Sequence, residues 1–155
     1  MKVNLIRKNS EKLDGYMNLD PHPSTDDVTA CSHENIDAFV DDGEAEEIRA
    51  CDVIDFLPTG KLMDTMKHWR KKLRLKGKLT IGGTDLREVA RSLQQGSISE
   101  QSANELLYNV NDTDWDIKRS AGTIEIMVNV FNQLGLKIEE KLLRNNRYII
   151  TGTRE

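Results

Sequence analysis

Carboxylate side chains follow several apolar segments whose patterns predict strands. Asp52 and Asp55 lie at the end of the fourth such segment, three residues apart, and Asp85 follows the fifth. Open α/β sheets place their chemistry at the carboxyl ends of strands. Two carboxylates at this spacing could there orient a substrate amine or act as a general base. The same carboxylates could instead belong to exposed acidic turns that have no chemical role. We favour that interpretation for Asp52, Asp55 and Asp85.

A further carboxylate, Asp20, ends the second predicted strand directly before Pro21. At the end of a strand in such a sheet, a carboxylate can accept hydrogen bonds from both hydroxyls of a ribose. Aspartate also commonly stops a strand ahead of a proline without binding anything. The sequence leaves both interpretations of Asp20 open.

The spacing of the cysteines, histidines, serines and glycines predicts neither a metal site nor a common nucleophilic motif. Cys31 and His33 are two residues apart and Cys51 follows 20 residues after Cys31, which matches no usual pattern of zinc ligands. We expect no metal, and we expect both cysteines to be free thiols because no secretory signal is evident. The sequence contains neither a phosphate-binding glycine loop nor a Ser–His–Asp arrangement.

Basic side chains concentrate between residues 67 and 78, in a segment that could contact a phosphate backbone. Met66, Trp69 and Leu73 fall at helical spacing in the same segment, which predicts that one helix face is core and that the charges form the solvated face. The net charge, 22 − 26 = −4, further disfavours a nucleic-acid partner.

Length and composition bound the class of protein. The 155 residues suit a single domain, residues 1–155, and the 37% of hydrophobic residues suffice for a mostly aliphatic core. No stretch approaches the ~18 consecutive apolar residues of a membrane span, and the first residues lack the apolar region of a signal peptide. We therefore expect a cytoplasmic protein without a membrane partner.

The first part of the chain predicts strands and loops. Strands are expected at Val3–Ile6 and Tyr16–Asp20, followed by a polar surface loop over 21–35, a weak strand at Ile36–Val40 and a buried strand from Ile48 to Leu57. Only about eight residues separate the first two strands, so any helix between them has one or two turns or is absent.

The second part alternates helices and strands. A helix with the apolar stripe Leu62, Met66, Trp69 and Leu73 is expected to end at Gly77, before a strand at Lys78–Ile81 and a loop at Gly82–Asp85. A second helix ends at Gly96, a third begins at the capping box of Ser97 and Glu100, and a last helical stripe runs from Ala121 to Leu134. The terminal segments 137–143 and 147–153 predict a tight hairpin around Asn145-Asn146, because asparagine tolerates positive φ. This order favours a three-layer α/β fold with two antiparallel strands at the end.

Several of these segments, in the same order, resemble those of small predicted class I S-adenosylmethionine-dependent methyltransferases. Val3-Asn4-Leu5, followed after a short loop by Gly15-Tyr16-Met17-Asn18-Leu19-Asp20, is similar to the opening of that family. Asp52-Val53-Ile54-Asp55-Phe56-Leu57 resembles its segment His-Val-Leu-Glu-His-Ile. Further along, Trp69 to Leu79 and Thr84-Asp85-Leu86 are similar to its Trp-x-Arg-Val-Leu-Lys-Pro-Gly-Gly-x-Leu and Pro-Asp-Leu.

The resemblance implies a Rossmann-like class I methyltransferase fold, which is a three-layer α/β/α sandwich. Its mostly parallel sheet would have the strand order 3-2-1-4-5-7-6 and an antiparallel last strand. S-adenosylmethionine is the implied cofactor, without a metal. The implied cofactor-binding positions are Leu5, Ile6, Arg7, Lys8, Asp20, Glu34, Asn35 and Asp52. At Glu34 and Asn35 the alignment slips by several residues, so a plain surface loop is favoured there.

One departure from the family bears directly on function. Ile6-Arg7-Lys8 stands where the family has Gly-Cys-Gly, and those glycines let the backbone approach the bound cofactor closely. We expect these side chains to weaken or abolish ordinary cofactor binding, although a basic pair could instead contact the cofactor's carboxylate. If the site is lost, Ile6 should pack inward and Arg7 or Lys8 should pair with Asp20.

Two classes of function follow from the sequence. The first is a methyltransferase whose acceptor stays unknown, because methyl transfer needs alignment more than catalytic side chains. The second is a non-catalytic module of the same fold that binds a protein partner, with nucleic acid as a weaker option. The sequence leaves assembly into a homo-oligomer open.

Overall fold

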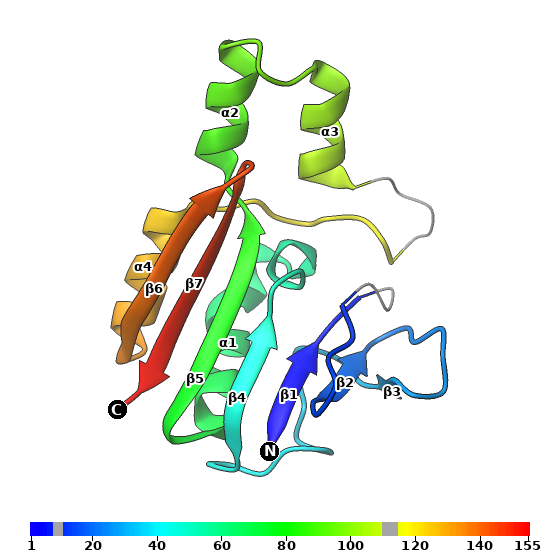
Figure 1. Cartoon of the computed structure of the whole chain (residues 1–155), viewed down its shortest axis with the longest axis vertical. Helices are drawn as coiled ribbons and strands as arrows, with labels where there is room; N and C mark the ends of the chain where they lie inside the picture. The colour runs from blue at the N-terminus through cyan, green and yellow to red at the C-terminus, as the bar shows by residue number, and fades with distance from the viewer. Residues whose placement is uncertain (8–10, 110–114) are drawn as a thin grey trace.

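The computed structural model describes residues 1–7, 11–109 and 115–155, in which seven strands form one sheet (Figure 1). The strand order is β3-β2-β1-β4-β5-β7-β6. The strands are β1 (Lys2–Leu5), β2 (Met17–Asp20), β3 (Thr29–Ala30), β4 (Ala45–Ala50), β5 (Leu73–Thr84), β6 (Leu136–Arg144) and β7 (Arg147–Arg154). This order confirms the expected 3-2-1-4-5-7-6.

The direction of the strands also agrees with the sequence-based expectation. Neighbours among β1 to β5 pair in parallel, whereas β7 is antiparallel to both β5 and β6. Asn145 and Asn146 join β6 to β7 with φ values of 53° and 62°, the positive values that a two-residue hairpin turn of this kind requires. The predicted Rossmann-like fold with an antiparallel last strand is therefore confirmed.

Apolar side chains on one face of the sheet form the core together with two helices. Helix α1 (Leu62–Lys72) contributes Met66 and Trp69, and helix α4 (Ile124–Gln133) contributes Phe131; all three are fully buried. They pack in one cluster with buried residues of the sheet such as Leu79 and Ile150. Figure 1 shows both helices behind the sheet.

The opposite face of the sheet carries polar side chains over its central strands. The Tyr16 hydroxyl donates a hydrogen bond to Glu47 at 2.7 Å, and the hydroxyls of Thr80 and Thr151 lie 3.0 Å apart across neighbouring strands. No helix among the described residues covers this face (Figure 1). Three layers were expected, but the described residues form only the sheet and the helical layer on one side of it. The second helical layer is missing because the described parts of the connections after β1 and β2 contain no helix.

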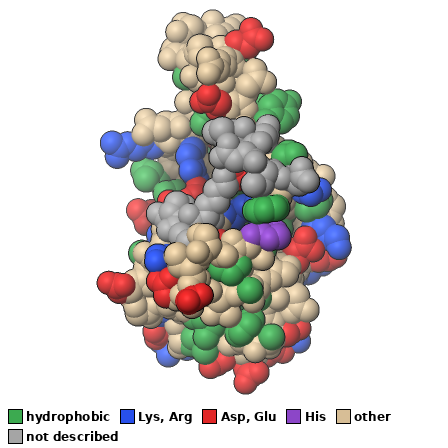
Figure 2. Space-filling model, turned by 90° about the vertical axis from the view of Figure 1, so that its right-hand side faces the viewer, with side chains coloured by type: hydrophobic (Ala, Val, Ile, Leu, Met, Phe, Trp, Pro, Cys, Tyr) green, Lys and Arg blue, Asp and Glu red, His purple; other side chains and the backbone are tan. Residues whose placement is uncertain are grey.

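A pair of short helices projects beyond the sheet. Helix α2 (Leu86–Gln94) and helix α3 (Glu100–Tyr108) form this helical arm, in which only Val89 and Ala103 are fully buried. Figure 2 shows the arm above the body of the molecule and, below it, basic and acidic side chains mixed over the same face. Among the described helices, none is long and apolar enough to cross a membrane.

Several predicted strands and loops differ from the structure. The strand predicted over Ile48–Leu57 is β4, which ends at Ala50, so the prediction is wrong beyond that residue. The segment Ile36–Val40, predicted as the third strand, consists of turns in which the side chains of Ile36 and Val40 are core, and β3 lies instead in the segment predicted as loop. The predicted loop residues Gly82, Gly83 and Thr84 belong to β5. Gly82 permits a close backbone approach there, because a Cβ at this position would come within 2.7 Å of the Cys51 carbonyl oxygen.

The helix boundaries also shift. Helix α1 ends at Lys72 rather than near Gly77, because Leu73 is extended (φ −67°, ψ 136°) and begins β5. The Lys72 side chain is buried between Asp37 and Asp42, with N–O distances of 2.5 and 2.8 Å, so this lysine is not part of a solvated face. Helix α3 is capped by Ser99 rather than Ser97, and short 3₁₀ turns occupy Ile54–Phe56 and Thr59–Lys61.

A glycine in β7 makes the packing of α4 testable. A Cβ on Gly152 would lie 2.7 Å from Cδ2 of Phe131, so we expect Gly152→Ala to lower the free energy of unfolding by about 1–3 kcal/mol through overpacking. Gly60→Ala is the matched control, because a Cβ on Gly60 meets nothing within 4 Å. Urea denaturation measures both variants, and equal stabilities would contradict this account of the contact.

Candidate functional site

The strand order reverses between β1 and β4, and the crevice at that point is where open α/β sheets bind ligands. The residues that follow β1 close against the neighbouring strand. Ile6 is 3% exposed, and its backbone N–H donates to the Leu19 carbonyl at 2.9 Å, so it continues β1 alongside β2. This is the inward packing expected of a closed site. Lys8 lies outside the described residues.

Arg7 turns across the crevice. Its guanidinium carbon lies 3.8 Å from the centroid of the Phe56 ring, a cation–π distance, and the guanidinium also donates a hydrogen bond to the backbone carbonyl of Trp115. Burial lowers the pKa of Arg7, and the charges of Asp20 and Asp116 partly offset that effect. The side chain of Arg7 therefore links three segments that are distant in the sequence.

Asp20, the residue considered for ribose binding, is 2% exposed. Its carboxylate accepts a hydrogen bond from the His22 backbone N–H at 2.8 Å. The ring of His22 in turn stacks on Trp115 with 4.6 Å between the ring centroids. The carboxylate thus lies at the position that the sequence predicted, but it is enclosed by the protein's own residues.

The carboxylates proposed for catalysis fall into two groups. Asp55 and Asp85 are 5% and 1% exposed, so the exposed acidic turn favoured from the sequence is wrong for both. Asp85 accepts hydrogen bonds from the backbone N–H groups of Glu88 (3.0 Å) and Ile124 (2.9 Å), and so caps α2 and the start of α4. Both carboxylate oxygens of Asp85 thus accept backbone N–H groups at helix starts, which is a structural role.

Asp55 is bound from two sides. Its carboxylate accepts a hydrogen bond from the Thr84 backbone N–H at 3.0 Å and lies 3.3 Å from the ammonium group of Lys118. Its backbone carbonyl accepts from the N–H groups of Arg119 and Ser120. Residues 115–122, which we call the crossing segment, are held across the edge of the sheet by these contacts (Figure 1).

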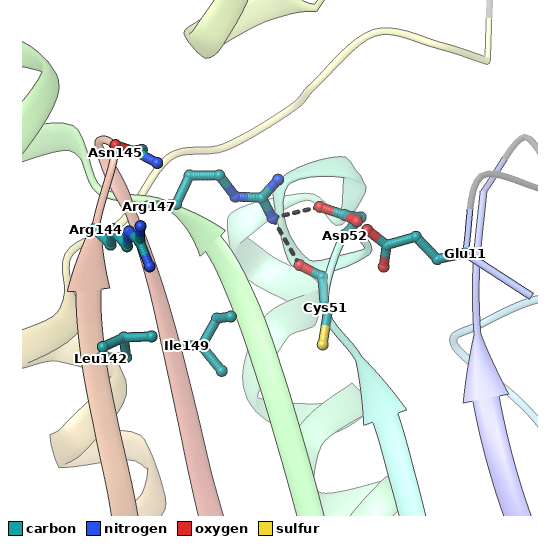
Figure 3. A pocket seen from close by; sticks show the side chains of 8 residues that line it. All are labelled: Glu11, Cys51, Asp52, Leu142, Arg144, Asn145, Arg147 and Ile149. Atoms are coloured by element: carbon teal, nitrogen blue, oxygen red, sulfur yellow. Dashed lines mark hydrogen bonds and ion pairs between the residues drawn. The ribbon is translucent and has the colours of Figure 1, made fainter. Parts of the chain in front are cut away.

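Asp52 is the least buried of the three candidate catalytic carboxylates, with its side chain 28% exposed. Burial works against its ionised form, but a hydrogen bond from Glu11 and the charge of Arg147 outweigh burial and lower the pKa of Asp52. The same hydrogen bond, together with burial, raises the pKa of Glu11 to about 7. Arg147 donates to the Asp52 carboxylate and, at 2.9 Å, to the Cys51 carbonyl (Figure 3).

Two cavities open at this edge of the sheet. The smaller, about 230 Å³, lies beside Arg7 and is lined by Arg7, Asp52, Asp55, Phe56, Asn109, Asp116, Lys118 and Arg147. The larger, about 400 Å³, lies beyond Arg147 and is lined by Glu11, Cys51, Asp52, Leu142, Arg144, Asn145, Arg147 and Ile149. Asp20 lines neither of the two.

The remaining predicted positions lie apart from this edge. Leu5 is a core residue of β1. Glu34 and Asn35 are exposed and make local turn contacts. The side-chain oxygen of Asn35, for example, accepts a hydrogen bond from the Asp37 backbone N–H at 2.9 Å. Cys31 and Cys51 are free thiols, and the described residues contain no group of three ligating side chains that could hold a metal.

Four residues that line these cavities were not predicted from the sequence: Glu11, Lys118, Arg144 and Arg147. Arg144 and Arg147 could have been suspected, because they flank the asparagine pair of the predicted hairpin and therefore lie at its tip. Glu11 and Lys118 lie in segments with no regular pattern, so no signal in the sequence pointed to them.

Neither a protein-family profile nor a curated protein sequence matches the chain. Solved structures do. A protein from Pyrococcus horikoshii OT3 is 17% identical with a TM-score of 0.60, and the match covers 91% of this chain and 73% of that protein. A putative methyltransferase of Haloferax volcanii, solved with the Trm112 methyltransferase activator, is 12% identical with a TM-score of 0.58, covering 90% and 72%.

An O-methyltransferase family protein from Burkholderia thailandensis is 11% identical with a TM-score of 0.57; the match covers 83% of this chain but only 35% of that longer protein. At such identities the similarity is one of fold. The chain has the class I methyltransferase-like fold.

The role assigned to Asp85 predicts a loss of stability. Asp85→Ala removes the acceptor of two backbone N–H groups, and we expect it to lower the free energy of unfolding by about 2 kcal/mol, since each lost cap costs about 1 kcal/mol. Asp85→Asn keeps one oxygen acceptor and should lose less. Urea denaturation compares the two, and an Asp85→Ala protein as stable as the unmodified chain would contradict the capping role.

His33 predicts a dependence of stability on pH. It is buried, its ring lies 3.0 Å from the Leu19 carbonyl, and burial lowers its pKa to about 4. In the unfolded chain the histidine pKa is about 6.5, so between pH 6.5 and pH 4 the unfolded state binds more protons at His33 than the folded state does. The free energy of unfolding is therefore highest above pH 6.5 and decreases as the pH falls towards 4.

The expected loss from this residue is about 3 kcal/mol across that interval, since each pKa unit corresponds to about 1.4 kcal/mol. Denaturation curves at pH 7, 5.5 and 4.5 measure it. His33→Gln should flatten the dependence, and an unchanged slope in that variant would assign the effect to other groups.

Proposed function

We propose that this chain is a binding module of the methyltransferase fold whose nucleoside site is closed by its own side chains. The observation that carries the proposal is the position of Arg7, stacked on Phe56 and bonded to the Trp115 carbonyl across the crevice. In this proposal, the protein does not transfer methyl groups from S-adenosylmethionine bound at the usual place in the fold.

The residues present do not fit S-adenosylmethionine. A nucleoside bound at the strand-order reversal needs a tight glycine turn after β1 and an accessible carboxylate at the end of β2. Here Ile6 and Arg7 follow β1, and Asp20 is 2% exposed. The cavity beside Arg7, about 230 Å³, is also smaller than the roughly 300–1,000 Å³ of most small-molecule sites.

A protein is the partner that the surface favours. Trp115 in the crossing segment is 48% exposed, and in the helical arm Leu86, Leu93 and Tyr108 are 44%, 43% and 54% exposed. Large apolar and aromatic side chains at the surface are typical of interaction sites. The complex of the Haloferax volcanii protein with its activator supports partnership within this fold. A second copy of the chain is an alternative occupant.

One observation favours the alternative that the chain is an enzyme: the carboxylate of Asp20 lies at the end of β2. In that alternative, the chain would move a methyl group from S-adenosylmethionine to an acceptor that it aligns, as the methyltransferase fold allows. Arg7 and the crossing segment would first have to leave the crevice.

Titration with S-adenosylmethionine and S-adenosylhomocysteine, by calorimetry and by thermal shift, tests the proposal. We expect the unmodified chain to show no binding at millimolar ligand. Arg7→Gly combined with Trp115→Ala should gain measurable binding. The first change removes the guanidinium that lies across the crevice, and the second removes the ring that stacks on His22 beside Asp20. Arg74→Gly combined with Tyr108→Ala is the matched control, since both residues are exposed and line neither cavity.

The outcomes separate the two functions. Micromolar binding by the unmodified chain would overturn the proposal and favour the methyltransferase. A gain of binding in the control pair would show that the effect is not specific to the crevice.

A further inference from the structure

The hairpin of β6 and β7 forms one wall of the larger cavity (Figure 3). Its register places Arg144 opposite Arg147 and Leu142 opposite Ile149. Side chains two residues apart on a strand lie on the same face of a sheet, so all four project from the face that no described helix covers. The wall is thus a pair of arginines beside the tip of the hairpin and, two residues further along each strand, a pair of aliphatic side chains.

The facing wall comes from the turn after β4 and from the loop after β1. Cys51 and Asp52 belong to the former and Glu11 to the latter. In Figure 3 the Asp52 and Glu11 side chains extend towards the hairpin, whereas Cys51 directs its backbone carbonyl to Arg147. Burial raises the pKa of the Cys51 thiol, so this residue adds a neutral, weakly polar surface opposite Ile149.

The charges of the two arginines are not equally compensated. Arg147 is bonded to the Asp52 carboxylate and the Cys51 carbonyl. Within the described part of the chain, no hydrogen bond or ion pair reaches the side chain of Arg144. Like charges directly opposite each other on antiparallel strands destabilise a hairpin, and an anion between them removes that repulsion. Arginine is also the side chain best suited to grip a carboxylate or phosphate through two parallel hydrogen bonds.

We propose that this cavity binds a small organic anion, a carboxylate or phosphate monoester attached to a compact apolar body. The anionic group lies between Arg144 and Arg147, and the body covers Leu142 and Ile149. The volume of about 400 Å³ suits a ligand of this size. Arg7 lines the other cavity, so this site goes beyond the proposed function and does not depend on whether the nucleoside site is closed.

The carboxyl groups of the facing wall make binding depend on pH. Glu11 faces Asp52, Arg147 and Arg49, and Lys118 acts on Asp52. As the pH falls from 8 to 6, Glu11 takes up a proton and the wall loses one negative charge. Affinity for a carboxylate that stays ionised over this range should then rise roughly threefold to tenfold, the effect of one charge a few Å away at a partly exposed site.

Benzoate and phenyl phosphate are the probes, titrated into the full chain and followed by calorimetry and by amide shifts in ¹H–¹⁵N spectra. Benzyl alcohol lacks the charge and inorganic phosphate lacks the apolar body. We expect at least one aromatic anion to bind more tightly than both of these, with shifts at residues 142–149. Tighter binding of benzoate identifies a carboxylate as the ligand class, and tighter binding of phenyl phosphate identifies a phosphate ester.

Arg144→Gln should weaken that binding at least tenfold without lowering the melting temperature, because it also removes the repulsion between the two arginines. Lys141→Gln is the matched control, because it removes the same charge from the same strand but lines a different cavity on the helix side. Equal losses in the two variants, binding of inorganic phosphate as tight as that of phenyl phosphate, or no binding of either aromatic anion would each overturn the proposal.

Discussion

The buried carboxylate of Asp55 fixes the arrangement of the whole functional edge. It joins the turn after β4 to the end of β5 through the Thr84 N–H and to the crossing segment through Lys118. Gly83 has no side chain at a point where a Cβ would approach this carboxylate to 2.8 Å. A buried charge with these partners is costly to disturb, because removing one partner leaves the other without compensation. Through the crossing segment, the same network presents the Trp115 carbonyl to Arg7. The closed crevice therefore depends on the contacts of Asp55 with Thr84 and Lys118, which hold the crossing segment in place.

The parts of the fold that could be predicted were those that leave a repeating signal in the sequence. The apolar stripes of α1 and α4, and the asparagine pair between β6 and β7, gave the correct elements because burial and positive φ constrain the residue types locally. Strand β3 escaped prediction because two residues cannot show an alternation. The end of α1 was missed because Leu73 continues the helical stripe, although the chain there turns into β5.

The site was harder to predict because its residues meet only in three dimensions. The positions of Asp20 and Asp52 beyond strands could be predicted because a carboxylate after a strand has a recognisable position, although Asp20 lines neither cavity. The burial of Asp55 and Asp85 was not visible, because an acidic turn and a buried cap have the same local sequence. The consequence of Arg7 could be anticipated only as steric interference; its contact with Phe56 and its bond to Trp115 depend on a segment more than a hundred residues away.

The polar face of the sheet has a consequence for how the protein responds to temperature. A sheet covered by helices on one side withdraws less apolar surface from water than one enclosed on both sides, and exposure of apolar surface dominates the heat-capacity change of unfolding. Cross-strand pairs such as Tyr16 with Glu47 and Thr80 with Thr151 make that face polar, so folding withdraws little apolar surface from water there. The heat-capacity change should therefore fall below the usual value of about 12–15 cal/mol/K per residue. Its stability curve should accordingly be broad and shallow, changing little over the temperatures at which cells grow.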